Sequence, residues 1–82
     1  MSFKCPCCGY LTISEKPPGT FEICPVCKWE DDDVQFNNHS FTGGANRVSL
    51  NQAKENFKKF GAIEERFIKR TRKPLPEEIR DE

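Results

Sequence analysis

Five cysteines are the residues with the clearest chemical potential in this sequence, and all of them lie between positions 5 and 27. Four of them form two pairs with the pattern Cys-Pro-x-Cys, Cys5 with Cys8 and Cys24 with Cys27. Two intervening residues let the backbone turn back, so that both sulfurs of a pair can point at one ion. Fifteen residues separate the pairs, and this arrangement predicts one tetrahedral site with these four thiolates as ligands.

Zinc is the metal that this donor set favours, at one ion per chain. Iron is the less favoured competitor: Cys-Pro-x-Cys-Gly-Tyr at positions 5–10 also resembles a rubredoxin knuckle, but nothing else suggests electron transfer. A redox dithiol is disfavoured, because such a pair lies at a strand-to-helix junction of a βαβ unit. Structural zinc contributes roughly 10–16 kcal/mol in small peptides. We therefore expect loss of the ion to unfold at least the cysteine-bearing segment.

The residues that follow the two pairs differ in kind. Gly9 follows Cys8, where such turns often need a left-handed backbone. Lys28 holds the matching place after Cys27, where a left-handed conformation costs about 1 kcal/mol unless the turn relaxes in another way. The lysine also offers positive charge beside a cluster that stays anionic with zinc bound, so we treat it as a local variation.

Cys7 stands outside the four-ligand count. One interpretation makes it a spare or alternate ligand, a reactive thiol that senses oxidants beside the cluster. The favoured interpretation makes it a small side chain on the outside of the knuckle. His39, the only histidine, is expected to be a loop residue, because four thiolates already complete the site. A closed site has no open coordination position, so the sequence predicts no catalytic residue and no enzyme.

Basic side chains gather in the C-terminal third of the sequence, although the formal net charge is zero. With the phenylalanines between them they could form a nucleic-acid surface. The neutral total favours instead a helix whose aromatic residues face the core and whose cations face water. The candidate nucleic-acid contacts, within a stretch from Lys54 to Lys73, are Lys58, Lys59, Arg66, Lys69, Arg70, Arg72 and Lys73.

Short segments rich in aromatic and β-branched residues must position the cysteines. Residues 10–13 and 20–23 are predicted strands, and Pro17-Pro18-Gly19 is the turn signal between them. Together they predict a hairpin that carries a cysteine pair at each end. Residues 3–4 add a third short run of the same kind.

Residues 30–48 are expected to form an ordered loop. Its acidic run Glu30-Asp31-Asp32-Asp33 does not fit a calcium loop, and is expected to be a solvated turn or a contact for the basic helix. The glycines of 43–46 are expected to permit tight turns rather than to bind an anion. Three apolar residues are expected to anchor the loop on the core: Val34, Phe36 and Phe41.

Residues 49–70 have the pattern of helices. Ser49 with Gln52 three positions later predicts a capping box, and Gly61 predicts a left-handed end. A second short helix is expected over 62–70, before Pro74 and Pro76 end the regular structure. One face of the first helix is expected to be apolar, with Leu50, Ala53, Phe57 and Phe60.

The chain is long enough for one domain with a marginal core, at 82 residues of which 35% are hydrophobic. Such a domain often needs a staple. The expected fold is a small α+β metal-bound domain, a zinc-ribbon or rubredoxin-like β-hairpin with one or two C-terminal helices. Its predicted parts are a single domain over 1–76 (zinc hairpin 1–29, loop 30–48, helical segment 49–70) and a frayed acidic tail over 77–82.

The sequence shows no export signal and no apolar run near the roughly 18–20 residues of a membrane span. An odd number of cysteines argues against a closed disulfide framework. We therefore expect a cytoplasmic protein, where thiols stay reduced.

An ordered series of motifs resembles the bacterial CPCC-type cysteine-rich domain family. The series is Cys-Pro-Cys-Cys-Gly-Tyr at 5–10, Pro-Pro-Gly at 17–19, Glu-Ile-Cys-Pro-Val-Cys at 22–27, Trp-Glu-Asp-Asp at 29–32, Gly-Gly-Ala-Asn at 43–46, Ser-Leu at 49–50 and Asn-Phe at 56–57. The resemblance covers most of residues 3–75. It implies a metal-binding domain of unassigned role.

The favoured function is a non-enzymatic module whose zinc is structural and whose surface binds a protein partner, which the sequence does not identify. Nucleic-acid binding through the Lys54–Lys73 face is the alternative. Redox sensing through Cys7 is a weaker one.

Overall fold

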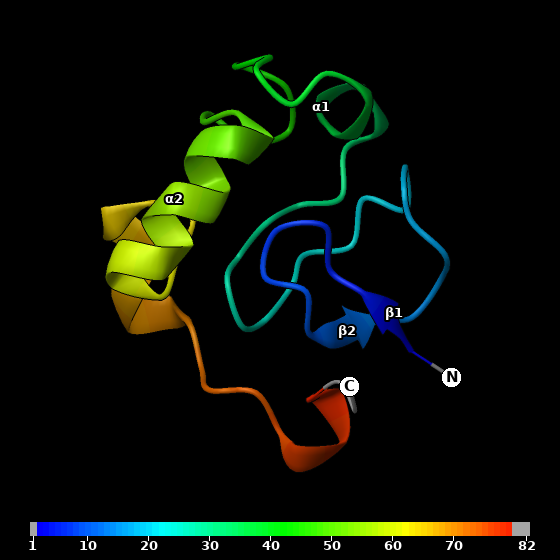
Figure 1. Ribbon diagram of the computed structural model, residues 1–82, viewed down its shortest axis with the longest axis vertical. Coiled ribbons are helices and arrows are strands. Elements are labelled where there is room, and N and C mark those ends of the chain that lie inside the picture. The colour runs from blue at the N-terminus through cyan, green and yellow to red at the C-terminus, as the bar shows by residue number, and fades with distance from the viewer. Residues whose placement is uncertain (1, 80–82) are drawn as a thin grey trace.

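The first cysteine pair lies in the turn of a two-stranded antiparallel hairpin. The computed structural model describes residues 2–79, and in it β1 (Phe3–Lys4) pairs with β2 (Leu11–Ile13) (Figure 1). Phe3 lies opposite Ile13, and Ile13 is fully buried. The strands therefore bring Cys5 and Cys8 to the edge of the core.

The predicted pairing of residues 10–13 with residues 20–23 is wrong. Residues 20–23 form no strand, and their one bridge joins Ile23 to Glu30. Phe21 has a left-handed φ of 57°, which interrupts the extended backbone. Its N–H donates to the carbonyl of Asp31 at 2.9 Å, so this segment turns towards the residues after the second cysteine pair. The observed fold thus consists of a short hairpin, a few helices and a cysteine cluster.

A short helix, α1 (Asp33–Asn37), interrupts the segment expected to be a loop. Asp32 caps it, because its Oδ1 accepts hydrogen bonds from the N–H groups of Val34 and Gln35 at 2.7 and 3.1 Å. Asp31 and Asp32 are buried, so the predicted solvated acidic turn is wrong. The Asp31 carboxylate accepts from the backbone and hydroxyl of Thr20 at 2.9 and 2.8 Å.

Burial disfavours the charge on Asp32, but hydrogen bonds from the N–H groups of Ala45, Gln35 and Val34 outweigh it and lower the pKa of this carboxyl. A lowered pKa in the folded state means that its contribution to stability is complete above the ordinary carboxyl pKa. That contribution is lost as the pH falls through the lowered value.

We therefore expect Asp32→Asn to lower the free energy of unfolding by about 1–3 kcal/mol at pH 7, because the Ala45 N–H loses its acceptor. Urea unfolding of the metal-loaded protein measures this loss. Asp33→Asn is the matched control, since the neighbouring carboxylate is exposed. Equal losses in the two variants would contradict the assigned role of Asp32.

Gln35, a fully buried side chain, holds the segment from Phe41 to Val48 against α1. Its Nε2 lies 2.9–3.1 Å from the carbonyls of Phe41, Asn46 and Val48. Its Oε1 accepts from the backbone and side-chain nitrogens of Asn46 at 3.1 and 2.9 Å. One buried amide thus anchors this segment to α1.

Of the predicted apolar anchors, Phe36 packs against the core, whereas Val34 and Phe41 are 52% and 40% exposed. The glycines permit the close approach instead. A Cβ on Gly44 would lie 2.7 Å from Asp32 Oδ2, so a larger residue there would push the segment away from α1. Gly43 has a φ of 81°, which confirms the tight turn expected there.

Helix α2 (Leu50–Phe60) begins and ends where predicted. Ser49 Oγ accepts from the Gln52 N–H at 3.1 Å, and Gly61 ends the helix with a φ of 78°. The second bond of a capping box does not form, because the Gln52 side chain donates to Asn56.

The buried face of α2 is shorter than predicted. Leu50 and Ala53 are fully buried and Phe57 packs at the edge of the core, but Phe60 is 38% exposed. The helix runs past the end of this small core. Its N-terminal half therefore holds it in place.

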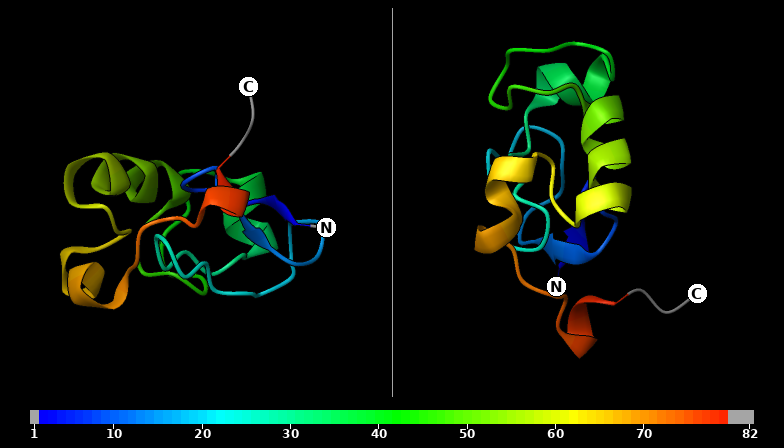
Figure 2. Two further views of the ribbon diagram at one scale, coloured as in Figure 1. Left: turned by 90° about the horizontal axis from the view of Figure 1, so that it is seen from below. Right: turned by 90° about the vertical axis from the view of Figure 1, so that its left-hand side faces the viewer.

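The second helical segment is a 3-10 helix, η1 (Glu65–Arg70), which lies beside α2 (Figure 2). Ile63, just before it, is buried, and the Asn56 amide donates to the Ile63 carbonyl at 2.8 Å. Phe67 is partly buried against the core. These contacts fix η1 relative to α2.

The expected end of regular structure near Pro76 is wrong, because η2 (Pro76–Glu78) follows. Glu78 is buried rather than frayed, and its carboxylate accepts two hydrogen bonds of 2.8 Å from Arg72. The Arg72 guanidinium lowers the pKa of the Glu78 carboxyl. The Arg72 N–H donates to the Pro25 carbonyl at 3.3 Å. This bond ties residues 72–78, which we call the Arg72–Glu78 strap, to the second cysteine pair. The rest of the predicted tail, residues 80–82, lies outside the described residues.

The core is centred on the cysteines and Trp29, which is fully buried. Strand, helix and knuckle residues all contribute to it, and its other large apolar side chains are Ile13, Leu50 and Ile63. No helix in the described part of the chain is both long and apolar enough to cross a membrane.

Candidate metal centre

The four predicted ligands come together in the folded chain. The sulfur atoms of Cys5, Cys8, Cys24 and Cys27 all lie within 4.8 Å of one another. Sulfur separations are 3.6 Å between Cys5 and Cys27 and 3.7 Å between Cys8 and Cys24. A tetrahedral ion with metal–sulfur bonds of about 2.3 Å holds its sulfurs about 3.8 Å apart. The cluster therefore has the donor set and size of a four-thiolate metal site.

The two pairs have the same backbone turn. In the first, the Cys5 N–H donates to the Tyr10 carbonyl at 2.8 Å, and the Gly9 N–H donates to the Cys5 carbonyl at 2.9 Å. In the second, the Cys24 N–H donates to the Trp29 carbonyl at 2.9 Å, and the Lys28 N–H donates to the Cys24 carbonyl at 2.8 Å. These local bonds orient the two sulfurs of each pair before the pairs meet.

Gly9 and Lys28 occupy equivalent left-handed positions, with φ of 81° and 75°. We expect Gly9→Ala to destabilise the protein by about 1–2 kcal/mol, because a side chain makes the left-handed conformation unfavourable. Lys28→Ala is the matched control and should change the backbone cost little, because that position already carries a side chain. Chemical unfolding of both metal-loaded variants measures the difference. A loss at position 28 as large as that at position 9 would show that the turns are not equivalent.

Within residues 2–79, a hydroxyl and a backbone N–H donate hydrogen bonds to the sulfurs. Thr12 Oγ1 lies 3.0 Å from Cys24 Sγ, and the Trp29 backbone N–H lies 3.4 Å from Cys27 Sγ. Sequence reasoning missed Thr12, since a threonine in a short strand has no signal that separates a sulfur partner from an ordinary strand residue. Only the pairing of β2 with β1 places its hydroxyl on the cluster.

The thiols of the cluster shift one another's pKa. Hydrogen bonds from the thiols of Cys27 and then Cys5 lower the pKa of Cys24. The hydrogen bond between Cys27 and Cys24 is the main cause that raises the pKa of Cys27. The bond between Cys8 and Cys24 likewise raises the pKa of Cys8. Four adjacent thiolates need a bound metal ion to balance their charge.

Cys7 is not on the outside of the knuckle, as was expected, because it is only 9% exposed and packs in the core. It is not among the four sulfurs of the cluster. His39 is exposed and lies edge-on to Phe36, away from the sulfur donors, as expected for a loop residue.

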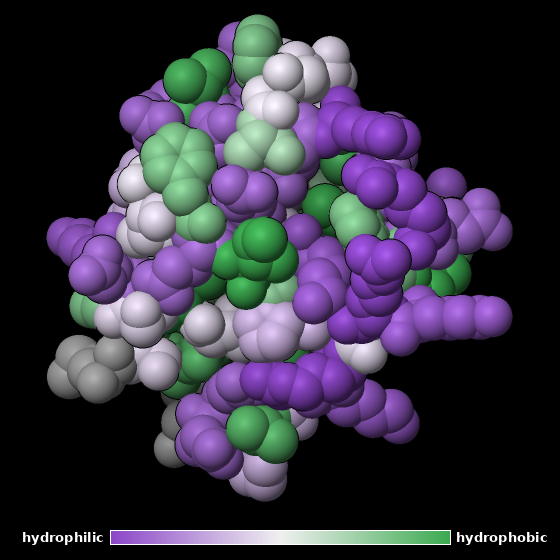
Figure 3. All heavy atoms as spheres, turned by 180° about the vertical axis from the view of Figure 1, so that it is seen from behind, coloured by the Kyte–Doolittle hydropathy of each residue, from purple (hydrophilic) through white to green (hydrophobic). Residues whose placement is uncertain are grey.

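The candidate nucleic-acid contacts are all exposed, but they do not share one role. Arg66 pairs with Glu64 at 3.0 Å, and Arg72 pairs with Glu78 at 2.8 Å. Lys58 and Lys59 are in the last turn of α2, and Lys69 and Arg70 in the last turn of η1. Lys73 follows in the segment that leads to η2. Figure 3, the face opposite to that of Figure 1, shows long hydrophilic side chains gathered on the side of α2 and η1.

A comparison with protein-family models gives a match over residues 3–78, to the family described as cysteine-rich CPCC. The matched range contains both cysteine pairs, both longer helical segments and the Arg72–Glu78 strap. No curated protein matches the chain at a significant level.

Proposed function

This chain belongs to the cysteine-rich CPCC family, and on that basis we propose that it is a zinc-stapled, non-enzymatic domain that binds a protein partner in the cytoplasm. The observation that carries the metal part is the meeting of four sulfurs within 4.8 Å. Cys5, Cys8, Cys24 and Cys27 hold the ion. The two equivalent turns support a structural site of the zinc-ribbon or rubredoxin-like kind.

A structural role follows from the number and burial of the donors. Four protein ligands complete a tetrahedron, which leaves no coordination position for a substrate or water. Cys5, Cys24 and Cys27 are at most 2% exposed, and Cys8 is half-buried. The ion therefore links two turns that are distant in sequence, and its energetic effect is on folding.

Metal analysis of the purified protein tests this function. We expect one zinc ion per chain and no visible absorbance, because zinc has a filled d shell. Iron bound by four thiolates would instead colour the protein. A colourless protein without metal, folded at neutral pH, would refute the structural zinc site.

The proposed binding of a protein rests on apolar side chains that the fold leaves in solvent. Phe21 and Ile23 lie two positions apart and are 53% and 56% exposed. Phe21 also has an unfavourable left-handed backbone, which the hydrogen bond to Asp31 supports. Exposed apolar side chains held on a rigid turn are suited to contact another protein.

A further inference from the structure

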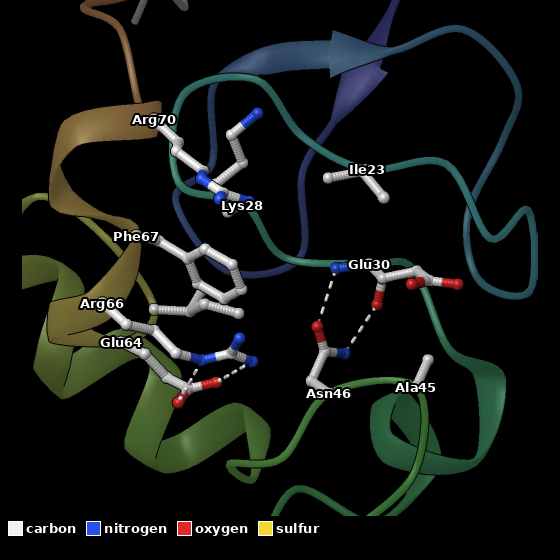
Figure 4. A pocket seen from close by; sticks show the side chains of 10 residues that line it. Ile23, Lys28, Glu30, Ala45, Asn46, Glu64, Arg66, Phe67 and Arg70 are labelled. Atoms are coloured by element: carbon white, nitrogen blue, oxygen red, sulfur yellow. Dashed lines mark hydrogen bonds and ion pairs between the residues drawn. The ribbon is translucent and has the colours of Figure 1, made fainter.

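A pocket of about 220 Å³ lies between the second cysteine turn and η1, apart from the sulfur cluster (Figure 4). We call it the η1 pocket. It combines three cationic side chains with two acidic ones on an apolar floor. Its ionisable lining residues are Lys28, Glu30, Glu64, Arg66 and Arg70.

Two guanidinium groups flank the aromatic ring of Phe67. The guanidinium carbon of Arg66 lies 4.2 Å from the ring centroid, and Arg66 also bonds to Glu64 at 3.0 and 3.2 Å. Figure 4 shows Arg70 on the other side of the ring, between Phe67 and Lys28. Among residues 2–79, Arg70 makes no ion pair, so its donors are open to a ligand.

Lys28 gives an independent indication that this wall has a function. The first turn shows that glycine satisfies the backbone here, yet the second turn carries a lysine at a φ of 75°. Its stem lines the pocket beside Arg70, and its ammonium group is directed away from Phe67 (Figure 4). Unfavourable backbone conformations are often retained where a side chain is needed.

The opposite wall is fixed and mostly uncharged. The Asn46 side chain bonds to both the N–H and the carbonyl of Glu30, at 2.9 and 2.8 Å. The Glu30 carboxylate is directed away from Phe67 in Figure 4, so Ile23, its bridge partner, supplies the apolar part of this wall. A ligand would therefore meet apolar surface on two sides and cations on one.

We propose that the η1 pocket binds a carboxylate carried on an apolar body about as large as one amino-acid side chain. The planar guanidinium of Arg70 pairs with the carboxylate in two parallel hydrogen bonds, and Lys28 adds a second positive charge. The apolar body packs on Phe67 and faces Ile23.

Size and charge favour this ligand over a nucleotide. Pockets for drug-sized ligands are about 300–1,000 Å³, so this one fits a smaller group. Its ionisable lining carries one net positive charge, which matches a monoanion better than a phosphate of higher charge. The carboxylate could belong to a free small acid or to the C-terminal residue of a polypeptide. Only the polypeptide source rests on the function proposed above.

Titrations of the ¹⁵N-labelled, metal-loaded protein test the site. The probes are 3-phenylpropanoate, its uncharged amide, the peptide Ala-Ala-Ala-Phe with a free or an amidated C-terminus, and AMP. We expect both carboxylates to shift the amide signals of Lys28, Phe67 and Arg70, and both amides to shift them little. Tighter binding of the peptide than of the free acid would identify a polypeptide terminus as the source, and similar affinities a small acid.

Arg70→Gln should weaken carboxylate binding about tenfold through the loss of a charge-assisted bond. Lys28→Gln should weaken it as well, without altering the backbone position. Lys69→Gln is the matched control, since Lys69 is an exposed cation of the same helix that does not line the pocket. Metal content and signal dispersion show that each variant is folded, independently of ligand binding. Equal affinity for acid and amide, equal affinity of the Arg70→Gln and Lys69→Gln variants, or tighter binding of AMP would overturn the proposal.

Discussion

Replacing Cys27 with serine is expected to abolish metal binding and to unfold the domain. Its sulfur is fully buried and lies 3.6 Å from that of Cys5, so solvent water has no ready access to its place. Structural zinc contributes roughly 10–16 kcal/mol, whereas a small domain has a net stability of about 5–15 kcal/mol. Removal of one ligand therefore removes most or all of the stability. Zinc analysis and circular dichroism of the purified variant measure both losses.

The same result is expected for serine at Cys5, Cys8 and Cys24. Cys7→Ser is the internal control: it should keep one zinc ion and lose only packing energy, because Cys7 lies in the core outside the four-sulfur cluster. Loss of zinc from the Cys7 variant, with zinc retained after Cys5→Ser, would exchange the roles of these residues. A chelator should reproduce the unfolding in the unmodified protein.

Gln35→Leu is expected to destabilise the metal-loaded protein by about 3–5 kcal/mol, although leucine is similar in size and more apolar. The change removes the partner of the Asn46 backbone and side-chain nitrogens and of up to three carbonyls. Each buried polar group left without a partner costs about 1–3 kcal/mol. Urea unfolding with zinc present measures the loss.

Gln52→Leu is the control for that experiment, since Gln52 is exposed and, in the part of the chain that the structure describes, its side chain bonds to Asn56 alone. It should change stability by less than about 0.5 kcal/mol. A Gln35 variant as stable as this control would mean that the segment from Phe41 to Val48 is held mainly by other contacts. Both variants should still bind one zinc ion, because neither residue contacts the sulfurs.

The cysteine cluster and α2 could be predicted because their signals are local. Each turn is closed by hydrogen bonds within six consecutive residues, so the spacing of Cys5 and Cys8 contains the geometry. Ser49 and Gly61 act on their own helix in the same way. For Lys28, a left-handed backbone and a turn relaxed in another way were the two predicted alternatives. The φ of 75° shows that the left-handed one is correct.

The strand pairing and the packing of residues 30–48 could not be predicted, because they depend on distant partners. Residues 10–13 and 20–23 have similar composition, but the left-handed Phe21 interrupts the extended backbone of the second segment. The helix α1 has five residues, too few for a helical period to show. Asp32 and Gln35 are polar, so a hydrophobicity pattern places them in solvent although both are buried.

The unequal burial of the four sulfurs has a consequence for the residence time of the ion. Cys24 and Cys27 have no exposed surface, whereas Cys8 is half-buried. A competing ligand can therefore reach a loaded site first at Cys8, while the second turn still holds the metal. Opening at Cys8 disturbs the turn between β1 and β2, and these strands are only two and three residues long. We expect the rate of metal exchange to be set by the opening of this short hairpin rather than by the strength of the metal–sulfur bonds.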